Sequence, residues 1–91
     1  MVVISDKREA YNRMKTVKIQ LSHLAEGQRG RVYQLEQKGS MHRRLQDLGL
    51  IPGTVVQCLR IAPAGSPVIY EIRGAMIALR TRDAEKIWVT L

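Results

Sequence analysis

The chain has 91 residues, a net charge of +7, a single cysteine and a hydrophobic share of 45%. A chain this short forms one small domain with a thin core, because small domains bury only about 60% of their unfolded surface. Its apolar stretches of about half a dozen residues are far below the roughly 20 that span a bilayer. The opening Met1–Ile4 is too short for a signal-peptide core, and a lone Cys58 excludes an internal disulfide. We therefore expect a cytoplasmic protein without stable membrane insertion, whose charge attracts anionic partners.

The first segment, residues 1–18, is basic and poor in apolar side chains. Five Lys and Arg residues against two acidic residues give it a net charge of +3 (five minus two). We interpret residues 1–18 as a basic arm outside the fold. The domain is predicted to occupy residues 19–91.

The domain is predicted to begin with a short helix and a strand. Ser22–Glu26 forms the helix in this interpretation, with Ser22 as its N-cap and Gly27 as the residue that ends it. Gly30–Leu35 is rich in β-forming residues and is predicted to be the first strand.

The clearest predicted helix follows, with Ser40 as its cap and Gly49 at its end. Met41, Leu45 and Leu48 recur at i, i+4 and i+7, which gives one apolar stripe. We expect this stripe to be buried in the core. If it is not buried, the helix becomes the partner-binding element instead.

From Gly53 onward the pattern is that of strands. Four more strands are predicted, at Thr54–Ile61, Val68–Arg73, Ala75–Arg80 and Ile87–Leu91. The residues predicted to face inward are Val55, Leu59, Ile61, Val68, Tyr70, Ile72, Ile77, Leu79, Ile87, Val89 and Leu91. Residues 62–67 form a loop, Arg73-Gly74 a tight hairpin turn and Asp83–Lys86 a single helical turn. Five short strands in so few residues predict a mainly β fold, a small barrel whose closure protects its edges.

Residue types that carry metal or covalent chemistry are few and scattered. His23, His42 and Cys58 have no HxxxH, CxxC or CxxH spacing, so we expect no metal site within one chain. The sequence has no GxSxG elbow and no GxxxxGK[ST] phosphate loop. We therefore expect no catalytic centre and no cofactor.

Two kinds of binding remain open. Eight arginines of the domain offer donors to the phosphates of a nucleic acid. Small barrels bind nucleic-acid strands through stacking aromatic side chains, and this chain has only Tyr11, Tyr33, Tyr70 and Trp88. The residues alone therefore favour a protein-binding module, with a small basic barrel that binds nucleic acid as the alternative.

Three blocks of the sequence resemble a known family. Residues 21–32, LSHLAEGQRGRV, resemble an opening LxxLxxGxxGxV, and residues 44–54, RLQDLGLIPGT, resemble RLxxLGLxPGT. Ser66-Pro67, followed by residues 72–74 and 77–80, resembles xPxxxxIxGxxIALR. In this order the blocks are similar to the FeoA family of ferrous iron transport protein A, and the resemblance covers about residues 17–91.

The resemblance implies an SH3-like barrel with one or two short inserted helices. FeoA-like proteins are cytoplasmic, non-enzymatic accessories of FeoB, a membrane ferrous-iron transporter with a cytoplasmic GTP-binding domain. The implied function is to bind the cytoplasmic part of such a transporter at the inner face of the membrane and to support iron uptake, with no specific nucleic acid as a partner. The same module is the C-terminal domain of some metal-dependent repressors. Such repressors need an upstream helix-turn-helix, for which residues 1–18 are too few. An effect on GTP hydrolysis through an arginine finger stays open.

The family motifs have structural explanations and disclose no binding surface. A docking patch needs apolar anchors surrounded by polar contacts, among which arginine is favoured. Val56, Ile69 and Met76 lie on the strand face opposite the predicted core and are unusually apolar for a solvated side. Together with Arg80 they form the predicted partner-binding patch. The alternative is that the helix or the basic arm covers these residues.

Overall fold

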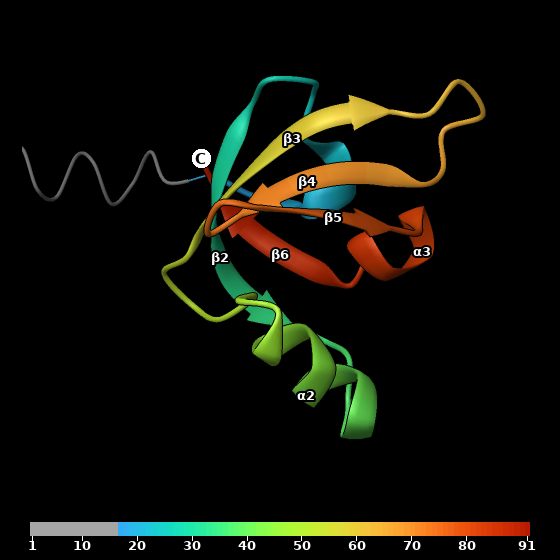
Figure 1. Ribbon diagram of the computed structural model, residues 1–91. Helices are drawn as coiled ribbons and strands as arrows, with labels where there is room; N and C mark the ends of the chain where they lie inside the picture. The colour runs from blue at the N-terminus through green and yellow to red at the C-terminus, as the bar shows by residue number, and fades with distance from the viewer. Residues whose placement is uncertain (1–16) are drawn as a thin grey trace, which may run out of the picture.

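Six antiparallel strands form one sheet in the computed structural model, which describes residues 17–91 (Figure 1). In chain order they are β1 (Lys18–Gln20), β2 (Arg29–Leu35), β3 (Val55–Ile61), β4 (Val68–Ile72), β5 (Ala75–Leu79) and β6 (Ile87–Thr90). Their order in the sheet is β1-β6-β2-β3-β4-β5, so β1 and β5 stand at its two ends. The mainly β fold is confirmed, but it has six strands where five were predicted.

β1 is the strand that the sequence analysis did not predict. It pairs antiparallel with β6, and the Leu91 N–H donates a hydrogen bond of 3.0 Å to the Val17 carbonyl beside it. Three residues are too few to show an alternating pattern, so only the pairing partner reveals this strand. Lys18, which the prediction assigned to the basic arm, thus belongs to the sheet, and Val17 is held beside it by this hydrogen bond. Residues 1–16 of that arm lie outside the described residues.

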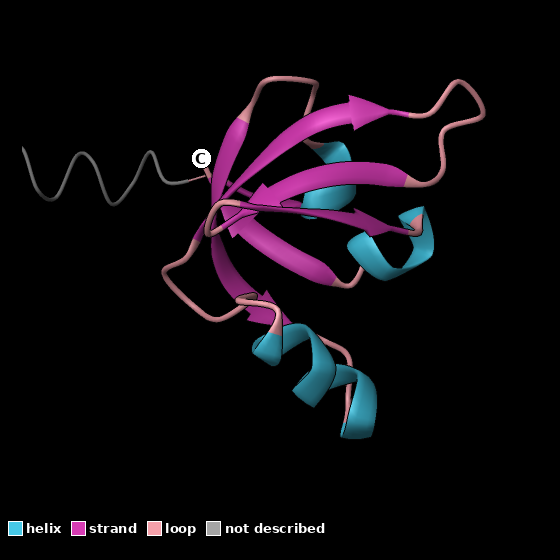
Figure 2. Cartoon of the chain, in the orientation of Figure 1, coloured by secondary structure: helices cyan, strands magenta, loops and turns pink. Residues whose placement is uncertain are grey.

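Three short helical segments connect the strands (Figure 2): η1 (Leu21–His23), α2 (Gly39–Asp47) and α3 (Thr81–Ala84). The first is a 3₁₀ turn that begins before Ser22, so the predicted cap at Ser22 is wrong. The cap at Ser40 is wrong as well, because Lys38 occupies the N-cap position of α2 and no side chain caps it.

The start of α3 shows why the predicted turn at Asp83–Lys86 lies two residues too late. The Thr81 N–H donates to Ser66 Oγ at 3.2 Å, and the Thr81 hydroxyl donates to the Gly65 carbonyl at 2.7 Å. The loop between β3 and β4 therefore supplies the partners of the first turn. Such a partner, 15 residues away in the chain, leaves no local signal in the sequence.

The core lies between the strands, η1 and α3. Its buried members are Leu21, Leu24, Val32, Leu45, Leu50, Val56, Cys58, Val68, Tyr70, Ile72, Leu79, Ala84, Ile87 and Val89. The predicted inward faces of β4 and β6 are confirmed except at Leu91, which is 54% exposed beyond the end of β6.

The predicted inward face of β3 is wrong at Val55 and right at Ile61, which is partly buried and packs against the core. Val56 and Cys58 are fully buried, whereas Val55 is 44% exposed. The pairing of β3 with β4 shifts register between Cys58 and Arg60, which breaks the period of two within the strand. Leu59 lies at the shift and Ile61 lies after it, and the alternation that these two residues suggested does not hold before the shift.

The hairpin turn predicted at Arg73-Gly74 is confirmed and positions β5. Arg73 has φ 51° and Gly74 has φ 81°. Positive φ at both central residues defines the two-residue hairpin turn that matches the twist of the flanking strands. Because the turn fixes the register, Ile72 faces Ala75 and each later residue of β5 has a defined partner in β4.

Candidate docking groove

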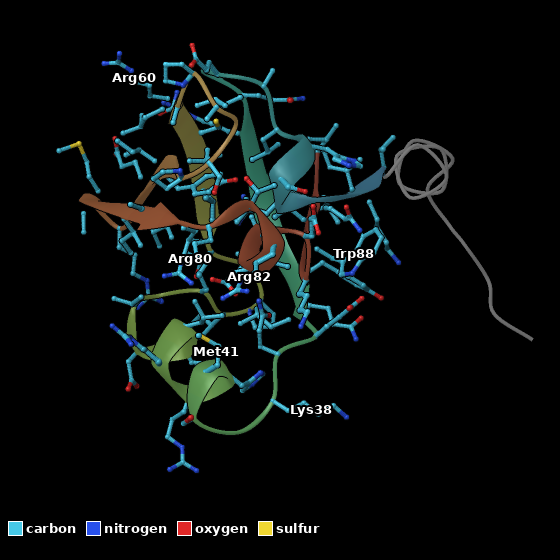
Figure 3. The ribbon with its side chains drawn as sticks, turned by 90° about the vertical axis from the view of Figure 1, so that its right-hand side faces the viewer. Lys38, Met41, Arg60, Arg80, Arg82 and Trp88 are labelled. Carbon is cyan, nitrogen blue, oxygen red and sulfur yellow. The ribbon has the colours of Figure 1, made fainter. Side chains whose placement is uncertain are left out.

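A groove of about 650 Å³ lies between α2 on one side and β5 with the start of α3 on the other. The residues that line it are Met41, Arg44, Leu45, Leu48, Met76, Ile77, Ala78, Leu79, Arg80, Arg82 and Asp83. Figure 3 shows Met41 on the side of α2 that faces Arg80 and Arg82. The groove thus joins two segments, around residues 41–48 and 76–83, that are separated in the chain by the two strands β3 and β4.

The α2 wall of the groove is only partly buried. Leu45 is 2% exposed and fixes the helix to the domain, while Met41 and Leu48 are each 40% exposed. The predicted burial of the stripe is therefore right for Leu45 and wrong for the other two. In Figure 1, α2 projects away from the strands, so its apolar stripe extends beyond the part of the core that covers it.

The opposite wall is the end strand β5. Met76 is 75% exposed, the largest value among the exposed large apolar side chains of residues 17–91. Ile77 and Leu79 point toward the core, with Leu79 buried and Ile77 half-buried. The groove floor is thus continuous with the core at Leu45 and Leu79, and its rim carries flexible methionines, which adapt to partner surfaces.

Three arginines give the rim a positive charge. Arg44, Arg80 and Arg82 line the groove together with one carboxylate, Asp83, which leaves a net charge of +2 (three minus one). Arginine beside exposed apolar side chains is the composition that carries binding energy at protein interfaces.

The predicted partner-binding patch divides into two parts. Met76 and Arg80 are exposed and both line the groove. Val56 is fully buried, so its predicted exposure is wrong: before its register shift, β3 has the opposite phase to the one predicted. Ile69 is half-buried on β4 opposite Ala78 and does not line the groove.

Met41 and Leu48 also line the groove, and the sequence analysis assigned their helix to partner binding only for the case that its apolar stripe is not buried. Their helical spacing was the available signal, but an apolar stripe alone does not reveal how far its neighbours cover it.

The metal-ligating and nucleophilic side chains lie apart from one another. Within residues 17–91, no three His, Cys, Asp or Glu residues are grouped so as to hold a metal ion. Burial raises the pKa of the Cys58 thiol, and the nearby Glu26 carboxylate adds to the shift, so the thiol stays protonated at neutral pH. His42 Nδ1 lies 2.8 Å from the Gln37 carbonyl oxygen. Because that oxygen only accepts, Nδ1 is the donor.

The aromatic side chains of residues 17–91 are already engaged. Tyr70 is fully buried, and Lys18 Nζ lies 4.1 Å from the centre of the Tyr33 ring. Trp88 is half-buried, and its Nε1–H donates to Glu36 Oε1 at 2.6 Å. Stacking platforms for single-stranded nucleic acid need free ring faces, so the burial of Tyr70, the partial burial of Trp88 and the Lys18 amino group over Tyr33 disfavour that mode of binding. In addition, no helix among residues 17–91 is long and apolar enough to cross a membrane.

Residues 19–91 match the family model of the FeoA domain. The chain belongs to the FeoA family. The Fe(2+) transport protein A/Fe(2+) transporter FeoB fusion protein of Porphyromonas gingivalis W83 is 32% identical over 73 residues, 80% of this chain. This chain spans only 9% of the length of that fusion protein, which links a FeoA domain to a ferrous iron transporter.

Solved structures support the same family. The FeoA protein of Chlorobium tepidum is 36% identical with a TM-score of 0.77, over 80% of this chain and 70% of that one. Stenotrophomonas maltophilia FeoA, solved with zinc and described as a procaryotic SH3 domain protein, is 26% identical with a TM-score of 0.68. That match covers 76% of this chain and 86% of the other. The predicted FeoA resemblance and SH3-like fold are confirmed.

Proposed function

We propose that this protein is a non-enzymatic cytoplasmic accessory that docks on the cytoplasmic part of a FeoB-type ferrous iron transporter and supports its activity. The family is linked to ferrous iron transport, and a relative carries the FeoA domain and the transporter in one polypeptide. Fusion holds two proteins at a fixed ratio and close together, which suits domains that act on one another.

The observation that carries the proposal is the groove between α2 and β5. It presents Met41, Leu48 and Met76 to solvent, beside Arg44 and Arg80. Large exposed apolar side chains grouped on one face mark an interaction surface, whereas isolated ones are normal. A partner that covers these three side chains would remove them from water and pair its acidic groups with the arginines.

Binding of the transporter's cytoplasmic domain to the purified protein tests the proposal by calorimetry. Leu48→Glu and Met76→Glu each place a charge on the groove, and we expect each to weaken binding about tenfold or more. Both side chains are exposed enough for the variants to stay folded.

Val55→Glu is the matched control, because Val55 is 44% exposed on β3 and does not line the groove. It should bind like the unaltered protein and restore iron uptake in cells that lack the accessory. If the unaltered protein does not bind the transporter domain, the proposed partner is wrong. If the groove variants bind as well as Val55→Glu, docking occurs elsewhere.

A further inference from the structure

We propose that the free edge of β5 binds an extended segment of a partner protein as an additional strand. The segment is apolar at alternate positions and carries carboxylates that meet the groove arginines. The identification of the partner as the transporter rests on the proposed function, whereas the binding mode rests on the backbone of β5 and its surroundings.

The first step is the direction of the backbone groups of β5. Within residues 17–91, β5 pairs with β4 alone. In a hairpin with a two-residue turn, the residues that flank the turn exchange both hydrogen bonds, and alternate residues do so from there on. Ala75, Ile77 and Leu79 therefore bond to β4. Met76 and Ala78 direct their N–H and C=O groups away from β4, to the free edge.

The second step is that this edge lacks the usual protection. Edge strands are normally blunted by charged residues, proline, bulges or short length. β5 has the sequence AMIAL, with five uncharged residues, no proline and an unbroken register to β4. The other end strand of the sheet, β1, is protected: it has three residues and begins with Lys18.

The third step is that the groove has a floor for side chains beside the free backbone groups. Ile77 and Leu79 of β5 line it, and Leu45 and Leu48 of α2 face them. Side chains of a strand point alternately to its two faces, so every second residue of an added strand faces the groove. Strand addition in which side chains enter a neighbouring apolar pocket is a known mode of peptide recognition.

The charge of the groove selects among the possible occupants. Residues 1–16 of this chain carry four basic and two acidic residues, a net charge of +2 (four minus two), which repels the arginine rim. Pairing of β5 with β5 of a second copy of this chain would bring that copy's arginine rim toward the first. A partner segment with carboxylates has the complementary charge, and complementarity of this kind fixes register and excludes wrong partners.

A proline at residue 78 separates strand addition from side-chain docking. Proline removes the outward N–H of Ala78 but leaves the hydrogen bonds between β5 and β4 intact. We expect Ala78→Pro to bind the transporter's cytoplasmic domain about tenfold more weakly than the unaltered protein. Ala78→Ser keeps the N–H and changes the side chain by a similar amount, so it should bind normally. Equal affinities of the two folded variants would overturn the proposal.

Amide hydrogen exchange of the unaltered protein, measured by NMR, gives the same answer if Ala78→Pro fails to fold. On saturation with the transporter domain, exchange should slow about tenfold or more at Met76 and Ala78. The amides of Ile77 and Leu79 are already bonded to β4, so their protection should change less. Binding without added protection at Met76 and Ala78 would show side-chain docking and refute strand addition.

A synthetic peptide makes the test independent of the transporter. The probe is an end-capped octapeptide in which Glu alternates with Val or Leu, and the control replaces each Glu by Lys. The acidic peptide should slow exchange at Met76 and Ala78, and the Lys peptide should bind more weakly. If the transporter domain does not bind but the acidic peptide protects these amides, strand addition at β5 is supported and the transporter is refuted as the partner. If neither ligand protects them, the strand site is wrong.

Discussion

Leu45 and Leu48 form a matched pair for testing how α2 is held on the domain. Both are leucines of the same apolar stripe, but Leu45 is 2% exposed and Leu48 is 40% exposed. Leu45→Ala removes core contacts and leaves a cavity, so it should lower the free energy of unfolding by about 2–4 kcal/mol. Leu48→Ala removes side-chain area that is already partly in water, and should lower it by about 1 kcal/mol. A small domain with a total stability of about 5 kcal/mol keeps little margin after the first change.

Urea denaturation of the two variants, followed by circular dichroism, measures both losses. The half-buried Trp88 supplies a second signal through its fluorescence, because unfolding breaks its hydrogen bond to Glu36. Coincident transitions would validate the two-state treatment. Equal losses, or a larger loss for Leu48→Ala, would refute the assignment of Leu45 as the anchor and of Leu48 as a groove residue.

Three further predictions follow from the described residues. The pKa of the Cys58 thiol is raised above its ordinary value of 9.0, because the folded protein holds the thiol proton more tightly than the unfolded chain does. The stability that the buried, protonated thiol contributes is therefore fully present below pH 9.0 and is lost at higher pH. Iodoacetamide should modify the native protein at pH 8 only as fast as the protein unfolds, and fast labelling of the folded protein would contradict this prediction. Gly49→Ala should lower the free energy of unfolding by about 1–3 kcal/mol, measured in urea, because φ is +106° and the new Cβ would lie 3.1 Å from Cγ2 of Ile72. Binding to DNA and RNA should be weak and disappear at moderate salt in a titration, whereas sequence preference that survives salt would favour the nucleic-acid alternative.

The parts of the fold that could be predicted are those set by neighbours in the chain. The alternation of β4 and the turn at Arg73-Gly74 depend on a few consecutive residues, and both are confirmed. β1 and the phase of β3 depend on pairing with distant strands. A register shift after Cys58 or a three-residue strand beside β6 has no signature in the local pattern.

The candidate site shows the same division. Met76 was selected because an apolar residue occupied the face expected to meet solvent, and Arg80 because arginine is favoured beside apolar anchors; both line the groove. The same reasoning selected Val56, and it failed there because the phase of β3 was inverted. The exposure of Leu48 depends on how far α2 projects from the strands. That distance is set by the loops at both ends of the helix, and hydrophobic periodicity does not encode it.

The place where the two ends of the described chain meet bears on how tightly the groove must bind. Val17 and Leu91 are joined by a backbone hydrogen bond, and the C-terminus lies on a different side of the domain from α2 (Figure 1). A polypeptide linked after Leu91 would begin away from the groove, and a partner held on such a linker is present at a high effective concentration, on the order of millimolar for short flexible linkers. Under the proposed docking, a FeoA domain fused to its transporter would therefore need only a weak, rapidly exchanging contact. A domain that meets its partner by diffusion needs a correspondingly longer residence time for the same occupancy.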